Sequence, residues 1–115
     1  MEGLLRERGG TLGVFCTTNA ATIGCIFLLK AEGAAIGPDV GVIGYDDSDW
    51  MLLSQPTISA ARTDPELIGR RAAKMLLDLL AGRAVAESAQ APVQLIVRES
   101  SLLRDNSSGG GGRAF

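Results

Sequence analysis

The feature that most constrains the fold of this sequence is Val40–Tyr45, a run of six residues without a charge. The turn-forming sequence Gly37–Asp39 precedes the run, and the acidic sequence Asp46–Asp49 follows it. A continuous apolar run of this length, bounded by turn signals, predicts a strand that is buried on both faces, as strands of parallel sheets are. Because both faces of such a strand must be covered, we expect helices elsewhere in the chain.

The rest of the chain alternates segments of strand type with segments of helix type. Leu12–Thr17 predicts a second buried strand, and a helix over residues 20–32 follows, with Thr18 or Asn19 as its N-cap. The clearest helix signals belong to Pro65–Ala81, which has Asp64 before it and Gly82 after it. Further expected elements are a short helix at 48–54 and extended segments at 57–62 and 92–98. This alternation predicts an α/β fold with a parallel, doubly wound sheet.

The composition indicates one domain and gives no sign of a nucleic-acid-binding surface or a metal site. The chain has 115 residues, of which 46% are hydrophobic, and its formal charge of −2 includes no Lys/Arg cluster. There is no histidine and no CxxC pair, so we expect no metal and no cofactor. We interpret Cys16 and Cys25 as reduced, buried thiols that act as small apolar side chains.

The two ends of the sequence differ from its centre. We expect residues 1–10 to be the remnant of a helix, residues 11–103 to form the folded domain, and residues 104–115 to be a disordered tail rich in Ser and Gly. The first residues are charged where a signal peptide needs apolar ones. The longest apolar stretch, Ile23–Leu29, is too short to span a bilayer. These patterns predict a cytoplasmic protein without membrane contact.

Two polar residues follow the predicted parallel strands at the end where ligands bind in α/β sheets. Asn19 comes after the strand that ends near Thr17, and Asp46 follows Tyr45 directly. A carboxylate can accept two hydrogen bonds from neighbouring sugar hydroxyls, and an amide can both donate and accept. The alternative is structural, with Asn19 capping a helix and Asp46 capping a turn. The spacing alone leaves both interpretations open.

The acidic sequence Asp46–Asp49 fits none of three common kinds of site. A calcium loop would need glycine where Trp50 and Met51 stand. Adjacent carboxylates in a turn diverge, so they cannot face each other across a bond as a catalytic pair does. The spacing of the nearby glycines is not that of a dinucleotide-binding loop. Without histidine, and without a nucleophile beside a base, the sequence predicts no catalytic residue and no enzyme.

A concentrated apolar segment follows the acidic turn. It consists of Trp50, Met51, Leu52 and Leu53. These side chains either pack on the domain's own core or face a partner, since Trp and Met are favoured in interface cores.

Four segments together resemble the C-terminal part of LacI/GalR-type transcriptional repressors. They are Val14–Asn19 continuing into Ala21–Gly24, then Pro38–Asp47, Arg62–Ala72 and Leu95–Ser101. The resemblance covers about residues 11–101, and Pro38–Asp47 is its most specific part. It implies a partial, type I periplasmic-binding-protein-like domain that takes part in effector binding and dimerisation.

The resemblance also implies partners and residue roles. The effector would be a sugar or a related small molecule, contacted by Asn19 and Asp46, and the chain would form a homodimer with Trp50–Leu53 near the interface. Operator DNA would be bound only through an N-terminal helix-turn-helix that these residues do not include. One departure is Ala20, because the family usually has aspartate after the asparagine.

A second departure concerns the N-terminal lobe and the first strands of the C-terminal lobe, which no segment matches. The helix at Pro65–Ala81 therefore lacks the sheet that it would cover. We expect its apolar stripe of Ile68, Leu76 and Leu79 to fold back on the remaining strands or to be buried between two chains. Two other hypotheses for the whole chain remain open at this point: a type I periplasmic sugar-binding protein of a transporter, and a truncated product without independent activity.

Overall fold

The computed structural model describes residues 12–86, 88–103 and 113–114. Within these ranges the chain divides into two compact units, one formed by residues up to Arg62 together with those from Leu95 onward, the other by Thr63–Gln94. The predicted helix remnant at 1–10 lies outside the described residues, as does most of the predicted tail at 104–115.

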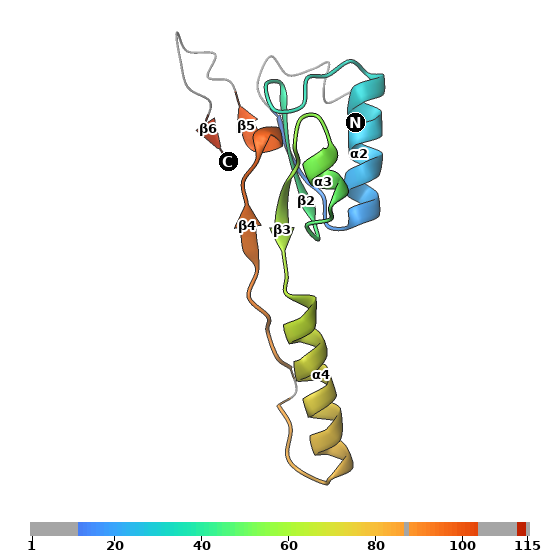
Figure 1. The fold of residues 1–115 in the computed structure, drawn as a ribbon, viewed down its shortest axis with the longest axis vertical. Coiled ribbons are helices and arrows are strands. Elements are labelled where there is room, and N and C mark those ends of the chain that lie inside the picture. Colours follow the sequence, from blue (N-terminus) through green and yellow to red (C-terminus); the bar gives the residue numbers. More distant parts are fainter. Residues whose placement is uncertain (1–11, 87, 104–112, 115) are drawn as a thin grey trace. The chain divides into compact units, whose positions relative to one another are not determined.

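The first unit contains most of a four-stranded sheet whose first three strands are parallel. Its strands are β1 (Leu12–Phe15), β2 (Val40–Tyr45), β3 (Ser59–Arg62) and β4 (Gln94–Ile96), and they lie side by side in that order. β1 pairs with β2 and β2 pairs with β3, both in parallel. The structure confirms the α/β fold and the parallel sheet, and the strand that the sequence predicts to be most buried is an inner one (Figure 1).

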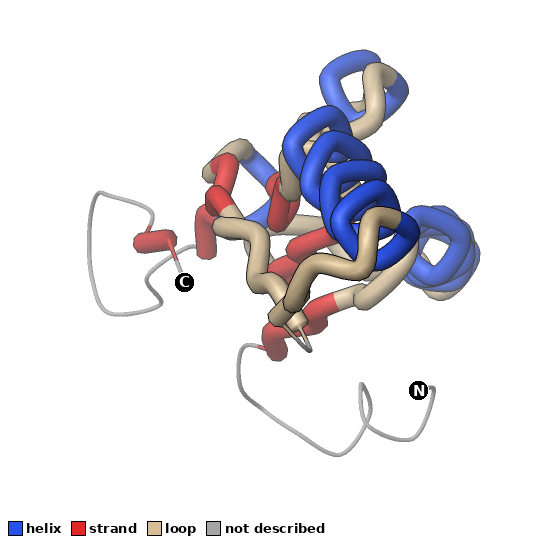
Figure 2. Tube along the Cα trace, turned by 90° about the horizontal axis from the view of Figure 1, so that it is seen from below, coloured by secondary structure: helices blue, strands red, loops and turns tan. Residues whose placement is uncertain are grey.

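Helix α2 (Asn19–Ala31) covers one face of this sheet, as Figures 1 and 2 show. It begins after Thr18, whose Oγ1 accepts a hydrogen bond of 3.1 Å from the backbone N–H of Ala21. It ends before Gly33, which has a φ of +70°, a conformation that glycine adopts without strain. The side chains of α2 that face the sheet are Thr22, Cys25, Ile26 and Leu29. They pack on the buried strand residues to form the core of this unit.

The core is closed by α3 (Trp50–Leu53) and the short 3₁₀ helix η1 (Glu99–Ser101). Three buried serine hydroxyls attach η1 to the sheet. The Ser100 hydroxyl donates to the carbonyl of Val42 at 2.6 Å and accepts from the N–H of Ser59 at 2.8 Å, and the Ser59 and Ser101 hydroxyls are 2.6 Å apart. These bonds satisfy polar groups that would be costly to bury alone, so they fix η1 beside the strands.

The second unit consists mainly of α4 (Pro65–Leu80). Asp64 caps it by accepting a hydrogen bond of 3.0 Å from the N–H of Leu67, as the sequence predicts. The helix buries none of its side chains: Ile68, Leu76 and Leu79 are 43%, 57% and 61% exposed. What covers this apolar stripe stays a prediction.

The remaining described elements are two short strands. β5 (Leu102–Leu103) pairs in antiparallel fashion with β6 (Arg113–Ala114). Across the described ranges, no helix combines the length and the apolar character that crossing a bilayer demands.

Candidate functional site

Asp46 lies at the carboxyl edge of the parallel sheet, directly after β2. Its backbone has a φ of +59°, in the left-handed region that aspartate tolerates better than most residues with a Cβ. Its N–H donates to the carbonyl of Ala61 at 3.0 Å, which ties the turn to β3. The residue as a whole is exposed, and its carboxylate makes no ion pair with the described residues. The turn therefore presents an acceptor to solvent where ligands dock on such sheets.

Asn19, the first residue of α2, lies beside this turn. Its Nδ2 donates to the Ser48 hydroxyl at 2.6 Å and to the carbonyl of Asp46 at 3.4 Å. Its Oδ1 accepts a hydrogen bond of 3.3 Å from the indole Nε1 of Trp50. The structure thus places Asn19 and Asp46 together, as expected from the strand ends. It also places Ser48 and Trp50 with them, which the spacing of the sequence did not indicate.

Asp47 has a different environment from Asp46. Both of its carboxylate oxygens accept hydrogen bonds from the Arg98 guanidinium, at 2.6 and 3.0 Å. Arg98 also donates to the carbonyl of Ile58 at 2.8 Å, and both side chains are almost buried. The hydrogen bond from Arg98 is the main reason why the pKa of Asp47 lies below its ordinary value. This pair fixes the turn to the segment after β4 and leaves the neighbouring Asp46 carboxylate exposed.

Two aromatic rings lie near the same edge of the sheet. Phe15 and Tyr45, the last residues of β1 and β2, meet edge to face with their ring centres 6.5 Å apart. Phe15 is 56% exposed, so part of this pair is available to a ligand. An exposed carboxylate next to an aromatic surface suits a small molecule that has both hydroxyl groups and apolar faces. Sequence analysis did not single out this pair.

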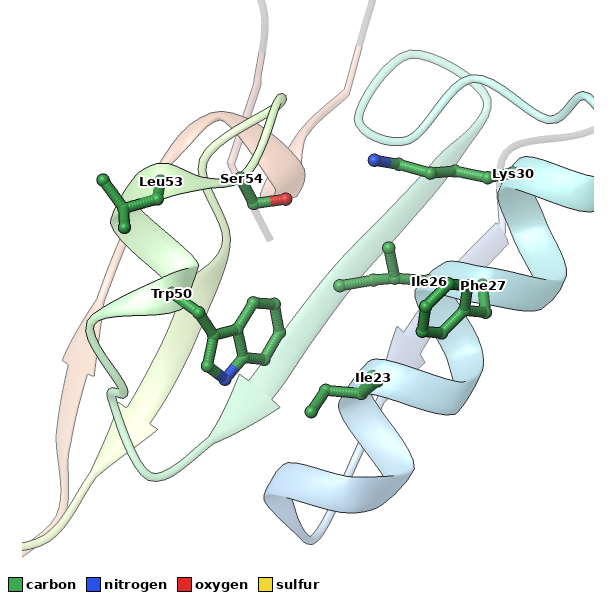
Figure 3. A pocket seen from close by; sticks show the side chains of 7 residues that line it. All are labelled: Ile23, Ile26, Phe27, Lys30, Trp50, Leu53 and Ser54. Carbon is green, nitrogen blue, oxygen red and sulfur yellow. The ribbon is translucent and has the colours of Figure 1, made fainter.

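An apolar groove separates α2 from α3, with a volume of about 350 Å³ (Figure 3). Its lining residues are Ile23, Ile26, Phe27, Lys30, Trp50, Leu53 and Ser54. In Figure 3 the Trp50 ring points toward Ile23 and Ile26 across the groove. The outer rim is open, because Phe27 and Leu53 are 72% and 86% exposed.

The four residues predicted to lie near a dimer interface occupy three environments. Met51 is completely buried and belongs to the core of this unit. For this residue, packing on the domain's own core is therefore the correct one of the two interpretations. Trp50 is half-buried between the core and the groove. Leu52 and Leu53 are exposed. Of these four residues, Trp50, Leu52 and Leu53 are therefore accessible to a partner, and Met51 is not.

The cysteines and acids of the described residues do not form a metal site. Cys16 and Cys25 are free and buried, as the sequence predicts. Burial, together with the neighbouring Cys16 thiol, raises the pKa of Cys25 to about 11, so the thiolate is strongly disfavoured. Their burial and the raised pKa of Cys25 support a structural role of the two cysteines in the core.

Comparison with known families gives one match that covers most of the chain. Residues 3–101 match the family described as "Periplasmic binding protein-like domain". Among curated proteins, the HTH-type transcriptional regulator CelR of Thermobifida fusca is 27% identical over 106 residues, which are 92% of this chain and 30% of CelR. The HTH-type transcriptional regulator GntR of Pseudomonas aeruginosa is 34% identical over 98 residues, which are 84% of this chain and 29% of GntR.

Solved structures show the same likeness. A complex of the transcriptional regulator CelR with cellobiose superposes with a TM-score of 0.68 at 30% identity, over 76% of this chain and 27% of that one. A dimeric Lac repressor with an 11-residue C-terminal deletion has a TM-score of 0.70 at 26% identity, over 81% of this chain and 34% of the repressor chain. The chain thus spans about 30% of the length of the curated relatives named above.

Proposed function

This chain belongs to the periplasmic binding protein-like domain family, its relatives are LacI-type transcriptional regulators, and from that premise we propose that it binds a sugar-like effector and self-associates. The observation that carries the proposal is the exposed Asp46 carboxylate at the carboxyl end of a parallel strand. The similar regulator CelR forms a complex with cellobiose, which supports a polyhydroxylated molecule as the effector class. Because the chain spans only part of its relatives, the activity of a whole regulator is part of the proposal.

In this proposal Asp46 contacts the effector directly. Its carboxylate accepts hydrogen bonds from two neighbouring hydroxyls, and the Phe15–Tyr45 pair offers an aromatic surface to an apolar face of the sugar. Asp47 does not take part, because Arg98 occupies both of its oxygens. Binding involves no covalent step, so the proposal assigns no catalytic residue and no cofactor.

The proposal assigns self-association to the face formed by α2 and α3. Phe27, Trp50 and Leu53 line the groove, and the exposed Leu52 extends its apolar surface. An exposed apolar patch with an aromatic centre is typical of an interface between protein chains. The similar Lac repressor described above is dimeric, which supports a homodimer.

DNA contact belongs, in this proposal, to parts of a regulator that lie outside this sequence. The relatives carry "HTH-type" in their names, whereas the described residues form a partial α/β domain without a cluster of basic side chains. A regulator of this kind would act in the cytoplasm, where its operator is.

The ligand proposal is tested by calorimetric titration of the chain with cellobiose and a panel of neutral sugars. Asp46→Asn keeps the shape of the side chain and tolerates the left-handed backbone, so it removes the charge without straining the turn. We expect this variant to weaken binding by about 10-fold or more, since a hydrogen bond to a charged group contributes about 1.5–3 kcal/mol.

The matched control is Asp49→Asn, which removes an exposed acid of the same turn that caps no helix with its side chain. It should bind as the unaltered chain does. Equal affinity of the Asp46→Asn variant and the unaltered chain would show that Asp46 is not the contact. Failure of every sugar to bind would reject the effector class.

A further inference from the structure

Asn19 connects the turn after β2 with the wall of the apolar groove. Its amide nitrogen donates to the Ser48 hydroxyl and to the carbonyl of Asp46, and its amide oxygen accepts from the indole N–H of Trp50. We propose that Asn19 is a positioning residue that couples the Asp46–Asp49 turn to Trp50, so that a ligand bound at Asp46 is sensed at the groove. The ligand in this statement rests on the proposed function, whereas the coupling rests on the hydrogen bonds alone.

The hydrogen-bond inventory of Asn19 favours this role over direct ligand contact. A side-chain amide has two N–H donors, and both are used, at 2.6 Å to Ser48 and 3.4 Å to Asp46. One lone pair of the oxygen accepts from Trp50 at 3.3 Å. The side chain therefore keeps at most one free acceptor position for a ligand, because its N–H groups and its other lone pair are bonded to protein atoms.

Helix capping does not explain this side chain. The N-cap of α2 is Thr18, whose hydroxyl accepts the N–H of Ala21 and whose carbonyl accepts that of Thr22. Asn19 is instead the first helical residue, and its amide points to segments 27, 29 and 31 residues away in the sequence. A purely local role would not require these three long-range bonds.

The turn is built so that a displacement at Asp46 reaches Trp50. The carbonyl of Asp46 accepts from both Asn19 and the Ser48 hydroxyl, the latter at 3.1 Å. The N–H of Met51 donates to the Ser48 carbonyl at 2.9 Å, within the first turn of α3, which begins at Trp50. Trp50 is therefore held from two sides, by the chain of the turn and by Asn19. In this proposal, a ligand that displaces the backbone of Asp46 shifts the carbonyl to which both Asn19 and Ser48 donate.

The first test needs no ligand, because Trp50 is the single tryptophan of the chain. Its indole N–H gives one resonance in a ¹⁵N NMR spectrum. Asn19→Ala removes all three hydrogen bonds and should move the indole resonance toward that of free tryptophan, together with the backbone amides of Asp46–Asp49. The amides of Ser100 and Ser101, in the same unit, should stay in place and show that the variant is folded.

Asn19→Asp distinguishes the hydrogen bond from the Trp50 indole from the hydrogen bonds to the turn. An aspartate keeps the acceptor for the indole but has no N–H, so the bond to the Asp46 carbonyl is lost. The Ser48 hydroxyl can reach the new carboxylate only by donating to it in place of the Asp46 carbonyl, which also releases the turn. The indole resonance should therefore keep its hydrogen-bonded position while the amides of Asp46–Asp49 move. Unchanged indole and turn resonances in Asn19→Ala, or equal effects of both variants on the indole, would overturn the proposal.

The second test adds cellobiose to the unaltered chain and to Asn19→Ala. In the unaltered chain, the amides of Asp46–Asp49 and the Trp50 indole should shift together along one binding curve. In Asn19→Ala the turn should still respond while the indole response is lost. An indole response of equal size in the unaltered chain and in Asn19→Ala would show that Asn19 does not couple the turn to Trp50. If no resonance responds to any sugar, the proposed function fails, and the ligand-free spectra alone decide the role of Asn19.

Discussion

At the scale of single residues, Asp47 and Arg98 form the most buried ion pair of the described part of the chain. Their side chains are 11% and 13% exposed, against 64% or more for the cation of each other pair. The pair is bidentate, and Arg98 satisfies a further backbone carbonyl, that of Ile58. Removing one partner of such a pair leaves an uncompensated charge in a poorly hydrated place, which is strongly destabilising.

We predict that Asp47→Asn lowers the free energy of unfolding by about 3 kcal/mol at pH 7. The pKa of Asp47 in the folded chain lies below the ordinary 3.8, chiefly because of its hydrogen bond to Arg98. Its contribution is therefore complete above the unfolded-state pKa and is lost as the pH falls through the folded-state pKa. Urea unfolding at pH 7 and at about pH 3 should show the difference between variant and unaltered chain shrinking at the lower pH.

Asp49→Asn serves as the control, since that exposed acid makes no cap hydrogen bond. It should leave the unfolding curve within about 0.5 kcal/mol of the original at both pH values. A difference between Asp47→Asn and the unaltered chain that is the same at both pH values would mean that the lost interaction is not one of the ionised carboxylate.

The residues of the site divide into those that sequence could find and those that it could not. Asn19 and Asp46 follow strands, and the carboxyl ends of parallel strands share one edge, so their proximity was predictable. Ser48 and Arg98 carry no such signal. Their contacts with Asn19 and Asp47 join positions 29 and 51 apart in the sequence, and such pairs depend on how the elements pack.

At the scale of elements, α2 and α3 both pack tightly against β2 at Gly44. A Cβ placed there would lie 2.7 Å from Cγ2 of Thr22 and 3.0 Å from Cε of Met51, both in the core. The glycine thus lets the helix approach the strand. Gly24, within α2 itself, has no atom within 4 Å of such a Cβ.

We predict that Gly44→Ala destabilises the chain by about 1–3 kcal/mol through overpacking. Gly24→Ala should stabilise it by about 0.5–1 kcal/mol, because alanine loses less backbone freedom in a helix and meets no neighbour here. Thermal unfolding of the two variants, followed by circular dichroism, checks both signs. A neutral Gly44→Ala would show that Thr22 and Met51 can move aside at little cost.

The elements with local signals were the most predictable. α4 begins after Asp64 and ends at Leu80, one residue from its predicted end, because its cap and first-turn proline are local. α3 is shorter than the predicted helix at 48–54, since Asp46–Ser48 are held in a turn by Asn19. The strand predicted over 92–98 covers only Gln94–Ile96, because Arg98 and the serines after it leave the strand to bond the sheet and the turn. These endings depend on partners that no local pattern reveals.

At the scale of the whole molecule, the described residues expose an apolar surface in each of the two units. One is the groove face of the first unit, with Phe27, Leu52 and Leu53 exposed. The other is the stripe on α4 in the second unit, formed by Ile68, Leu76 and Leu79. Apolar surface of this kind drives association, and either face could pair two copies of the chain.

We predict that the chain forms a dimer through the groove face. The groove offers a concave, partly preformed surface with Trp50 held in place by Asn19, whereas α4 presents a convex stripe with no buried residue. Leu53→Glu places a charge at the rim and should raise the dimer dissociation constant by about 10-fold or more. Size-exclusion chromatography with light scattering over a wide concentration range measures this constant.

Leu79→Glu is the matched variant, because Leu79 is also exposed but lies on α4. It should leave the dissociation constant close to that of the unaltered chain. If Leu79→Glu abolishes the dimer and Leu53→Glu does not, the stripe on α4 is the interface and the assignment to the groove is wrong. A monomer at every concentration would reject self-association by either surface, and the hydrogen bonds that hold Trp50 would then serve the fold of the single chain.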